Sequence, residues 1–525
     1  MRWNGWPAAG LAVGLAMAAP AQAEAPRLTQ DAIREARTRE EPHLLGEFTQ
    51  LLAIPNLASD RDDIRRNAEE IAAMLRERGL QPELLGAPDA SDAPPLVFAE
   101  WKVKGAHRTL VLYAHYDGQP VNPRDWTAPP FQPVLKRAPG AMSDTAPDAR
   151  VFARSAGDDK GGVMAILGAI DVIRALHATP TDNLKIVFEG EEEAGSPHLN
   201  ALLKAHADQL RSDLWIVCDG PVHPSGRVQV IYGARGDMNV DLTVYGPSHP
   251  LHSGHYGNWA PNPALRLAQL LASMKDADGR VTIDGWYDDI VPLGRKEQQA
   301  IDGSAKYDDA VLAKLGLAAP ESRLGLAASA TEPSLNINGL HSADVGDEAA
   351  NVIPAEASAV LDVRLVAGET PQKQFERLQH HLTKAGYLVL DRPPTMEERL
   401  RHPRIARLSL RPGVYTAART AMDHPSAASV VAAVRTATDG AVLELPSSGA
   451  SLPLSVIKDS LGAPGIAISI ANDDDNQHAA DENLRLGNLW AGVDLFAAVL
   501  LRQDLASSSE TKARNLAIPA ASPRP

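Results

Sequence analysis

The chain has 525 residues, more than one hydrophobic core usually covers, so two domains are expected. With 44% hydrophobic and 22% charged residues it has the composition of a soluble globular protein, and its net charge of −15 argues against nucleic acid or an anionic membrane surface as the main partner. A single cysteine, Cys218, excludes an intramolecular disulfide and any zinc site built from several thiolates. A metal site in this chain would need His, Asp and Glu ligands.

Residues 1–23 are typical of a cleavable signal peptide. Arg2 gives a positive start, an apolar stretch covers residues 8–19, and Ala21-Gln22-Ala23 fits a small-x-small cleavage site. The apolar stretch is shorter than the ~20 residues of a membrane-spanning helix, although a short anchor or a buried helix remains an alternative. We therefore expect a soluble mature protein that begins near Glu24 and is secreted or periplasmic, without a membrane partner.

The predicted catalytic domain covers residues 24–236 and 416–506, with a disordered tail over 507–525 that is rich in Ser, Ala and Pro. Helices are predicted over 30–50, 62–80 and 161–178. Short continuous apolar runs are typical of strands covered on both faces, and they occupy Thr109–Ala114, Leu184–Phe188, Leu214–Cys218 and Gly465–Ile470. Strands that alternate with helices predict an α/β fold with a mostly parallel sheet.

Residues 237–415 show a different pattern and are predicted to form an inserted domain. Six elements follow one another in the order βαββαβ: a strand over 239–245, a helix over 263–274, strands over 334–340 and 355–366, a helix over 370–386 and a strand over 387–391. This order indicates a ferredoxin-like α+β domain. The stretch 275–333 between its first helix and second strand is irregular, and we expect long loops there.

Potential metal ligands follow each predicted strand of the catalytic domain. Sites in open α/β sheets form at the carboxyl ends of the strands, so these residues are expected to converge. They are His115 and Asp117, then Glu192 and Glu193, then Asp219, then His478, with Asp158 just before the predicted helix at Gly161. A single residue of this kind is commonly a solvated loop residue or a helix cap. A whole set on successive strand ends rarely arises by chance and indicates a metal site. His with carboxylate oxygens suits zinc, with manganese or cobalt as substitutes.

Several motifs carry a resemblance to a known family. HYDGQPV, AGDDKGG, EGEEEAGS, the aspartate of VCDG, LHSG and HAADE occur in this order along the chain. Together they resemble the carnosinase and glutamate-carboxypeptidase family of di-zinc metallopeptidases and deacylases. The aspartate at position 219 is similar to that of the dipeptidase-like branch. The sequence PSSGAS departs from that branch, which usually has an arginine and an acidic residue there.

The resemblance implies two divalent ions, most simply zinc, that share one bridging ligand. It assigns Asp158 to both ions, His115 and Asp219 to one, and Glu193 and His478 to the other. It further implies that Asp117 orients His115 and that Glu192 is the general base, which takes a proton from the attacking water and delivers it to the leaving amine.

The resemblance also implies residues that contact the substrate. Asn351, Arg364 and Ser451 match substrate-binding positions, and His252 in the inserted domain matches a histidine that reaches the active site of the partner subunit. The inserted domain is accordingly expected to act as a lid and to form a homodimer.

The sequence thus predicts a metal-dependent hydrolase that cleaves the amide bond of small peptides, as a dipeptidase or carboxypeptidase does. An N-acyl-amino-acid deacylase of the same architecture would use the same residues and remains the alternative. A metal-binding receptor without activity would have no use for Glu192, and a serine hydrolase would be expected to carry a G-x-S-x-G elbow, which this sequence lacks.

Overall fold

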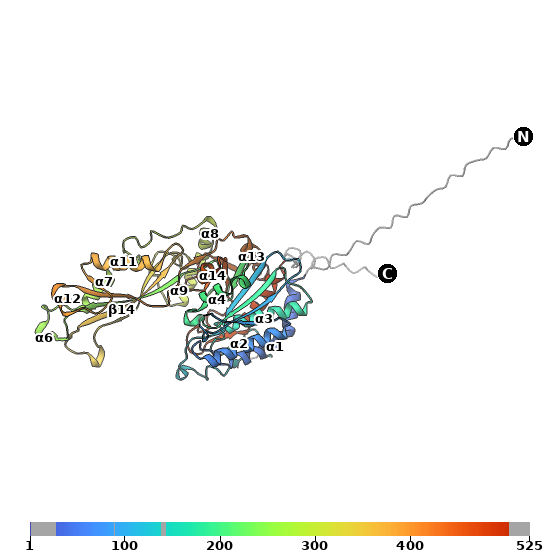
Figure 1. The fold of residues 1–525 in the computed structure, drawn as a ribbon, viewed down its shortest axis with the longest axis horizontal. Helices are drawn as coiled ribbons and strands as arrows, with labels where there is room; N and C mark the ends of the chain where they lie inside the picture. Colours follow the sequence, from blue (N-terminus) through green and yellow to red (C-terminus); the bar gives the residue numbers. More distant parts are fainter. Residues whose placement is uncertain (2–27, 89, 138–142, 503–525) are drawn as a thin grey trace.

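The computed structural model describes residue 1 and residues 28–88, 90–137 and 143–502, and Figure 1 shows that they form two lobes. The predicted signal peptide, apart from Met1, and the predicted tail lie outside the described residues. The larger lobe carries the N- and C-terminal described segments, and the middle of the chain builds the smaller one.

The larger lobe is built on an eight-stranded mixed sheet in the order β1-β2-β6-β3-β7-β19-β8-β18. The bounds are β1 Glu83–Leu85, β2 Leu96–Trp101, β3 Thr109–His115, β6 Asn183–Glu189, β7 Leu214–Val217, β8 Val228–Ile231, β18 Val442–Leu445 and β19 Gly465–Ile468. The four predicted strands are its adjacent central members β6, β3, β7 and β19, and they pair in parallel. The edge pair β18–β8 is parallel as well, whereas β1–β2, β2–β6 and β19–β8 are antiparallel, so the sheet is mixed with four parallel pairs of seven.

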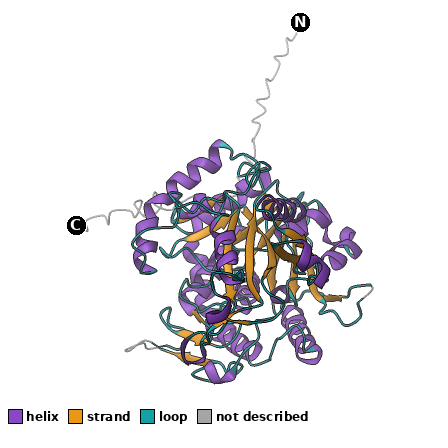
Figure 2. Cartoon of the chain, turned by 90° about the vertical axis from the view of Figure 1, so that its left-hand side faces the viewer, coloured by secondary structure: helices purple, strands orange, loops and turns teal. Residues whose placement is uncertain are grey.

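Helices cover both faces of this sheet, as the view in Figure 2 also shows. On one face lie α1 Gln30–Leu52, α2 Arg61–Glu77, α3 Lys160–Ala175, α13 Pro425–Ala437 and α15 Leu486–Leu500. On the other lie α4 Leu199–Ala205 and α14 Leu454–Leu461. Because neither face meets water, the central strands are largely apolar and do not alternate. Cys218, which follows β7 directly, is buried and has a free thiol, in keeping with a small apolar residue at this position.

The smaller lobe contains a five-stranded sheet in the order β12-β14-β10-β16-β15, with its own hydrophobic core. The bounds are β10 Gly236–Tyr245, α7 Pro263–Ala272, β12 Ser334–His341, β14 Glu356–Leu365, α11 Pro371–Lys384, β15 Leu388–Leu390 and β16 Ile405–Leu410. The predicted βαββαβ elements are all present. The strand next to β10 is β16, however, which the sequence did not reveal, and the predicted last strand β15 pairs with β16 at the sheet edge.

The expectation of long loops over 275–333 was right only in part, because residues 275–294 and 315–325 lie outside helices and strands but much of the remainder is helical. This segment contains α8 Arg295–Ser304, α9 Asp308–Lys314 and α10 Leu326–Ser329. Few of its apolar side chains are buried, among them Ile301 and Val311, so the helical repeat is faint in the sequence. Helix α8 packs on β18 of the large sheet, so the segment contributes to the larger lobe.

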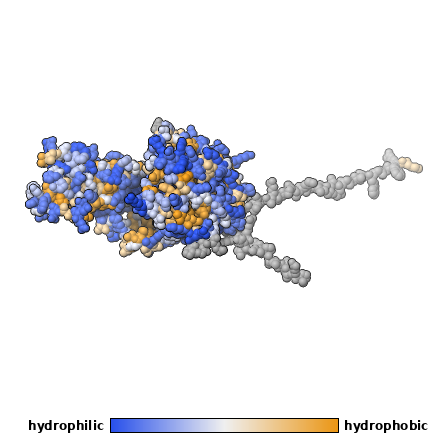
Figure 3. Space-filling model, turned by 90° about the horizontal axis from the view of Figure 1, so that it is seen from below, coloured by the Kyte–Doolittle hydropathy of each residue, from blue (hydrophilic) through white to orange (hydrophobic). Residues whose placement is uncertain are grey.

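Among the described residues, no helix combines the length and the apolar character needed to cross a membrane. Figure 3 shows a largely hydrophilic surface with separate apolar patches on both lobes.

Candidate metal centre

All five predicted ligands converge at the carboxyl ends of the central strands. His115 ends β3, Asp219 follows β7, His478 lies in the loop after β19, and Glu193 lies in the short 3-10 turn η2 after β6. Asp158 precedes α3. The side chains form two groups that share Asp158, namely His115–Asp158–Asp219 and Asp158–Glu193–His478, and in each group the candidate ligand atoms lie within 4.8 Å of one another.

The two carboxylate oxygens of Asp158 face opposite groups. Oδ1 lies 2.9 Å from Nε2 of His115, and Oδ2 lies 3.0 Å from Nε2 of His478, which is itself 3.2 Å from Oε2 of Glu193. A carboxylate that offers one oxygen to each group is suited to bridge two cations.

The chemistry of the donors fits two divalent cations. Burial raises the pKa of Asp219 to about 7, and the negative charge of Asp158 adds to this effect. Hydrogen bonds to Asp158 and Glu193 raise the pKa of His478 to about 10. Crowded, buried carboxylates are costly without compensating positive charge, and imidazole with carboxylate oxygens is a donor set that zinc and similar ions accept.

Asp117 is fully buried and positions three of its neighbours. Its Oδ1 lies 3.3 Å from Nδ1 of His115, and its two oxygens accept hydrogen bonds of 3.0 Å from the backbone N–H groups of Glu192 and Glu193. One carboxylate thus sets the orientation of a ligand on β3 and of the η2 turn after β6.

Glu482 was not singled out from the sequence, although it lies within the HAADE motif. It is fully buried and accepts hydrogen bonds from the backbone N–H groups of Ser155, Gly157 and Asp158 at 2.9–3.0 Å. Its partner is the guanidinium of Arg154, at 2.6 Å. Glu482 therefore fixes the turn that presents Asp158. The sequence carries no signal for this role, because nothing along the chain distinguishes a buried structural acid from a solvated one. The peptide bond between Asp158 and Asp159 is cis.

Glu192 lies on the η2 turn beside Glu193 and faces the same cavity as the candidate ligands. Burial raises the pKa of its carboxyl group well above the ordinary value. Within the described part of the chain its carboxylate has no hydrogen-bond or ion-pair partner. The turn ends at Gly195 with φ of +86°, and a Cβ at Gly190 would meet the ring of Tyr116 at 2.4 Å, so both glycines allow the tight path that separates the two glutamates.

The cavity has a volume of about 450 Å³, which suits a small molecule. The candidate ligands Asp158, Glu193, Asp219 and His478 contribute acidic and imidazole groups to its lining. Its other lining residues include Ser451 and Arg235, and apolar side chains from Ile231, Leu326, Leu445 and Leu452.

Arg235 is a cavity residue that the sequence did not reveal. Its Nε donates to the carbonyl of Gly449 at 3.0 Å and its Nη1 donates to Oγ of Ser334 at 3.3 Å, and these bonds fix the plane of the guanidinium. Burial lowers its pKa to about 10, with a smaller contribution from the charge of Arg364. Its position in YGARG, after a strand of ordinary appearance, offered no pattern that would mark it.

Arg364 lies behind this wall and does not line the cavity. Its Nη1 donates to Oγ of Ser451 at 3.2 Å, and its Nε lies 3.0 Å from Asp362 and 3.8 Å from Asp237. Arg364 and Ser451 are thus brought together next to Arg235, but Arg364 has carboxylate partners of its own.

His252 and Asn351 are brought together with each other but not with the cavity of their own chain. The backbone N–H of Ser253 donates to the carbonyl of Asn351 at 3.0 Å, where β11 Leu251–His252 pairs with β13 Val352–Ile353. Both side chains are exposed. Helix α6 Ser253–Tyr256, which follows His252, lies at the end of the smaller lobe that is remote from α3 (Figure 1).

Comparison with known proteins places this geometry in a family. Residues 111–502 match the family described as peptidase family M20/M25/M40. The chain belongs to this family. Membership confirms the predicted resemblance and the predicted metal-dependent hydrolase with peptidase chemistry.

Relatives within the M20 family match over nearly the whole described chain. The Cys-Gly metallodipeptidase DUG1 of Saccharomyces cerevisiae is 27% identical over 87% of this chain and 95% of its own length. The human Beta-Ala-His dipeptidase is 25% identical over 88% of this chain and 86% of its own. Among solved structures, a metallo-carboxypeptidase from Sulfolobus solfataricus shares 26% identity, with a TM-score of 0.71 over 88% of this chain and 99% of the other.

Proposed function

We propose that this M20 enzyme is a metallodipeptidase that hydrolyses the amide bond of short peptides. The observation that carries the proposal is the pair of ligand groups sharing Asp158, with the unpartnered carboxylate of Glu192 facing the same cavity. Relatives named as dipeptidases support dipeptides as the substrate over N-acyl amino acids, the alternative with the same catalytic set.

The five ligands would hold two divalent ions, zinc by preference, with manganese or cobalt as substitutes. When bound, such ions lower the pKa of an attacking water and polarise the scissile carbonyl. Glu192 accepts the proton of that water and donates it to the leaving amine. Burial raises the pKa of Glu192, so its carboxylate is a stronger base than an ordinary one and accepts the proton of the water more readily. The carboxylic acid so formed persists near neutral pH and can protonate the leaving amine.

The substrate carboxylate is held at the cavity wall formed by Arg235, Ser451 and Arg364. A guanidinium binds a carboxylate through directed hydrogen bonds, which fixes orientation as well as adding affinity. Because Arg235 lines the cavity and Arg364 lies behind Ser451, Arg235 makes the direct contact and Arg364 positions Ser451. Arg364 and Ser451 were predicted to contact the substrate, and this assignment adds Arg235 as the direct contact.

The smaller lobe acts as a lid and joins two copies of the chain into a homodimer. His252 and Asn351 lie far from their own metal centre, so a role for them in catalysis requires a second subunit. Exposed apolar side chains near His252 support an interface on this lobe. They are Tyr256, Trp259 and Leu265, with exposed fractions of 41%, 81% and 59%.

We further propose that residues 1–23 direct the chain out of the cytoplasm and are removed. The support is the pattern of charge, apolar run and small residues. The N-terminal sequence of the mature protein, determined after expression in a secreting host, should begin at or near Glu24.

The proposed function is tested by measuring turnover and metal content together. The metal-loaded enzyme should hydrolyse dipeptides faster than N-acetyl amino acids. Glu192→Gln should retain two ions per chain and lose turnover, whereas the matched variant Glu193→Gln should lose one ion. Faster hydrolysis of N-acetyl amino acids than of dipeptides would show that the enzyme is a deacylase. Full activity with one ion bound at saturation would refute the two-metal centre.

A further inference from the structure

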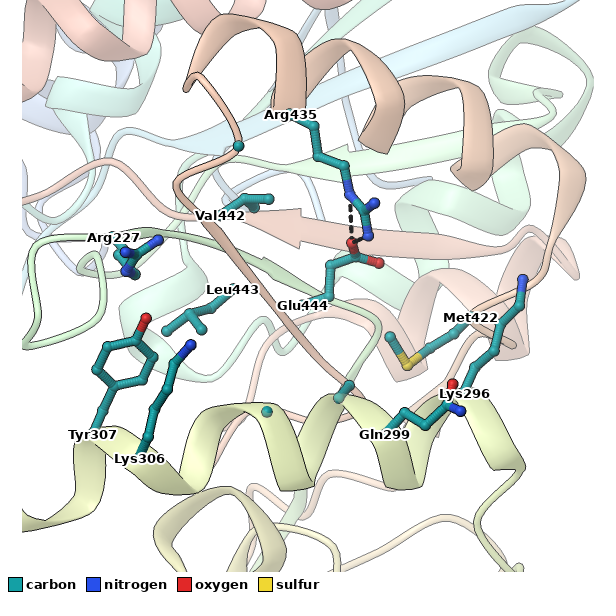
Figure 4. Close-up of a pocket in the computed structure, with 13 residues that line it drawn as sticks. Arg227, Lys296, Gln299, Lys306, Tyr307, Met422, Arg435, Val442, Leu443 and Glu444 are labelled. Atoms are coloured by element: carbon teal, nitrogen blue, oxygen red, sulfur yellow. Dashed lines mark hydrogen bonds and ion pairs between the residues drawn. The ribbon is translucent and has the colours of Figure 1, made fainter.

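A second cavity, with a volume of about 530 Å³, lies between the segment 295–307 and the edge of the large sheet (Figure 4). Helix α8 and the 3-10 turn η3 Ala305–Tyr307 form one side, and β18 with the end of α13 forms the other. None of its lining residues lines the metal cavity. It is therefore a separate site.

The lining of this second cavity is basic in a chain whose net charge is −15. Its cations are Arg227, Lys296, Lys306 and Arg435, and its one carboxylate is that of Glu444. Glu444 accepts a hydrogen bond of 2.9 Å from Nε of Arg435, shown as a dashed line in Figure 4, and one of 3.1 Å from the hydroxyl of Tyr232. The acid is thus matched by Arg435, and three cations remain.

Two of these cations gather at one aromatic ring. The guanidinium of Arg227 lies 5.5 Å from the ring centre of Tyr307, and Nζ of Lys306 lies 5.1 Å from it. Within the described residues neither Arg227 nor Lys306 forms an ion pair with a carboxylate. Like charges held together repel unless an anion joins them. Lys296 lies at the other end of the cavity and also lines a neighbouring one together with Asp423, so it is not part of the proposed anion site.

We propose that this cavity binds a small oxyanion, carried by a phosphate or carboxylate group, at the end formed by Arg227, Lys306 and Tyr307. The guanidinium offers paired N–H donors, the ammonium offers a point charge and the phenol offers a further O–H donor. The volume exceeds that of a bare inorganic anion, and Leu443 supplies an apolar floor, so a metabolite-sized ligand fits.

The η3 turn separates this anion site from the metal cavity. Lys306 and Tyr307 face the basic cavity, whereas Ser304 and Asp308 on either side of them line the metal cavity. The ring of Tyr307 packs at 5.5 Å against that of His223, another lining residue of the metal cavity.

Asp308 extends the connection to a second segment that lines the metal cavity. Its Oδ2 accepts a hydrogen bond of 3.2 Å from the backbone N–H of Leu326, whose side chain lines the metal cavity. An anion that fixes Lys306 and Tyr307 therefore fixes the wall that the substrate meets. Bound anion should lower KM for the peptide, and this second part rests on the proposed function.

The anion site itself is tested by titration calorimetry on the metal-loaded enzyme at low ionic strength, with sulfate and succinate as probes. Saturable binding at one site per chain is expected, weakened by at least ~10-fold in Lys306→Gln and in Arg227→Gln because each removes a charge-assisted hydrogen bond. The control Lys204→Gln removes an exposed lysine on α4 and should bind as the wild type does. Binding of sulfate alone would identify an inorganic-type oxyanion, and binding of succinate alone a carboxylate.

Absence of saturable binding, or equal binding in all four proteins, would overturn the anion site; equal binding is the result expected if the probes bind only at the metals. The coupling is read from KM for a dipeptide with and without probe, at ionic strength held constant with chloride. The probe should lower KM in the wild type and leave it unchanged in Lys306→Gln. If Lys306→Gln loses probe binding but the probe does not change KM of the wild type, the anion site stands and its coupling to the metal cavity is refuted. The calorimetric result does not depend on peptidase activity, so failure of the anion site and failure of the proposed function can be told apart.

Discussion

Replacement of Arg235 tests how the substrate is held. Two of the three guanidinium nitrogens are engaged by Gly449 and Ser334, which leaves Nη2 for the substrate carboxylate. A hydrogen bond between charged groups contributes ~1.5–3 kcal/mol, so Arg235→Ala should lower kcat/KM for a dipeptide by about 10- to 150-fold. Arg235→Lys keeps the charge but loses the bonds that fix the plane, and it should recover only part of the loss.

The informative assay compares a dipeptide with its C-terminal amide in each protein. The wild type should prefer the free acid, and Arg235→Ala should lose most of that preference, whereas a merely structural defect would slow both substrates equally. Because the contact exists in both the bound substrate and the transition state, the loss should appear mainly in KM. Arg364→Ala is the matched control and should change the preference less. An unchanged preference in Arg235→Ala, with a large change in Arg364→Ala, would refute the reasoning and restore Arg364 as the direct contact.

Four further outcomes are expected. Glu192→Gln should retain its metals and lose ~10²–10⁴-fold in kcat, and turnover above a tenth of wild type would require another base. Asp158→Asn should reduce bound metal, measured by elemental analysis, because both ligand groups share this residue; two ions at full occupancy would contradict the bridge. His252→Ala and Glu192→Gln, each nearly inactive, should recover up to about a quarter of wild-type activity when refolded together, because one site of each mixed dimer is complete; no recovery would contradict a shared site. Burial raises the pKa of Glu369 to about 7 from 4.5, so the folded state holds this proton more tightly, and the free energy of unfolding should fall by up to about 3 kcal/mol as pH rises through that window; an equally steep fall in Glu369→Gln would show that another group is responsible.

The centre of the fold and the ligand set could be predicted because each left a local signal. The strands β3, β6, β7 and β19 show in the sequence as short apolar runs, and an acidic or imidazole residue follows each of them. Because these neighbouring strands are parallel, those residues meet at one edge of the sheet. Strands buried on both faces are typical of parallel sheets, and parallel strands bring their carboxyl ends to one edge.

The remainder depended on long-range contacts. β15 is a short apolar run whereas β16 contains Arg407 and Ser409, and only long-range pairing with β10 shows that β16 lies beside it. The role of Glu482 arises from three backbone N–H groups of a turn distant in sequence. Arg235 enters the cavity because the carbonyl of Gly449 and the hydroxyl of Ser334 direct it there, and neither lies near it along the chain.

The position of β19 affects how the chain becomes an enzyme. This strand lies between β7 and β8 in the middle of the sheet, yet it and His478 come from near the C-terminal end of the described chain. A protein synthesised from its N-terminus would pass through a stage in which the inner edges of β7 and β8 have no partner, and such edges invite pairing with other chains. The same delay keeps a nascent chain from hydrolysing peptides, because the second ligand group is incomplete until His478 arrives. Loss of the C-terminal part of the chain from β19 onward should therefore yield aggregated, inactive protein, with no partly active fragment.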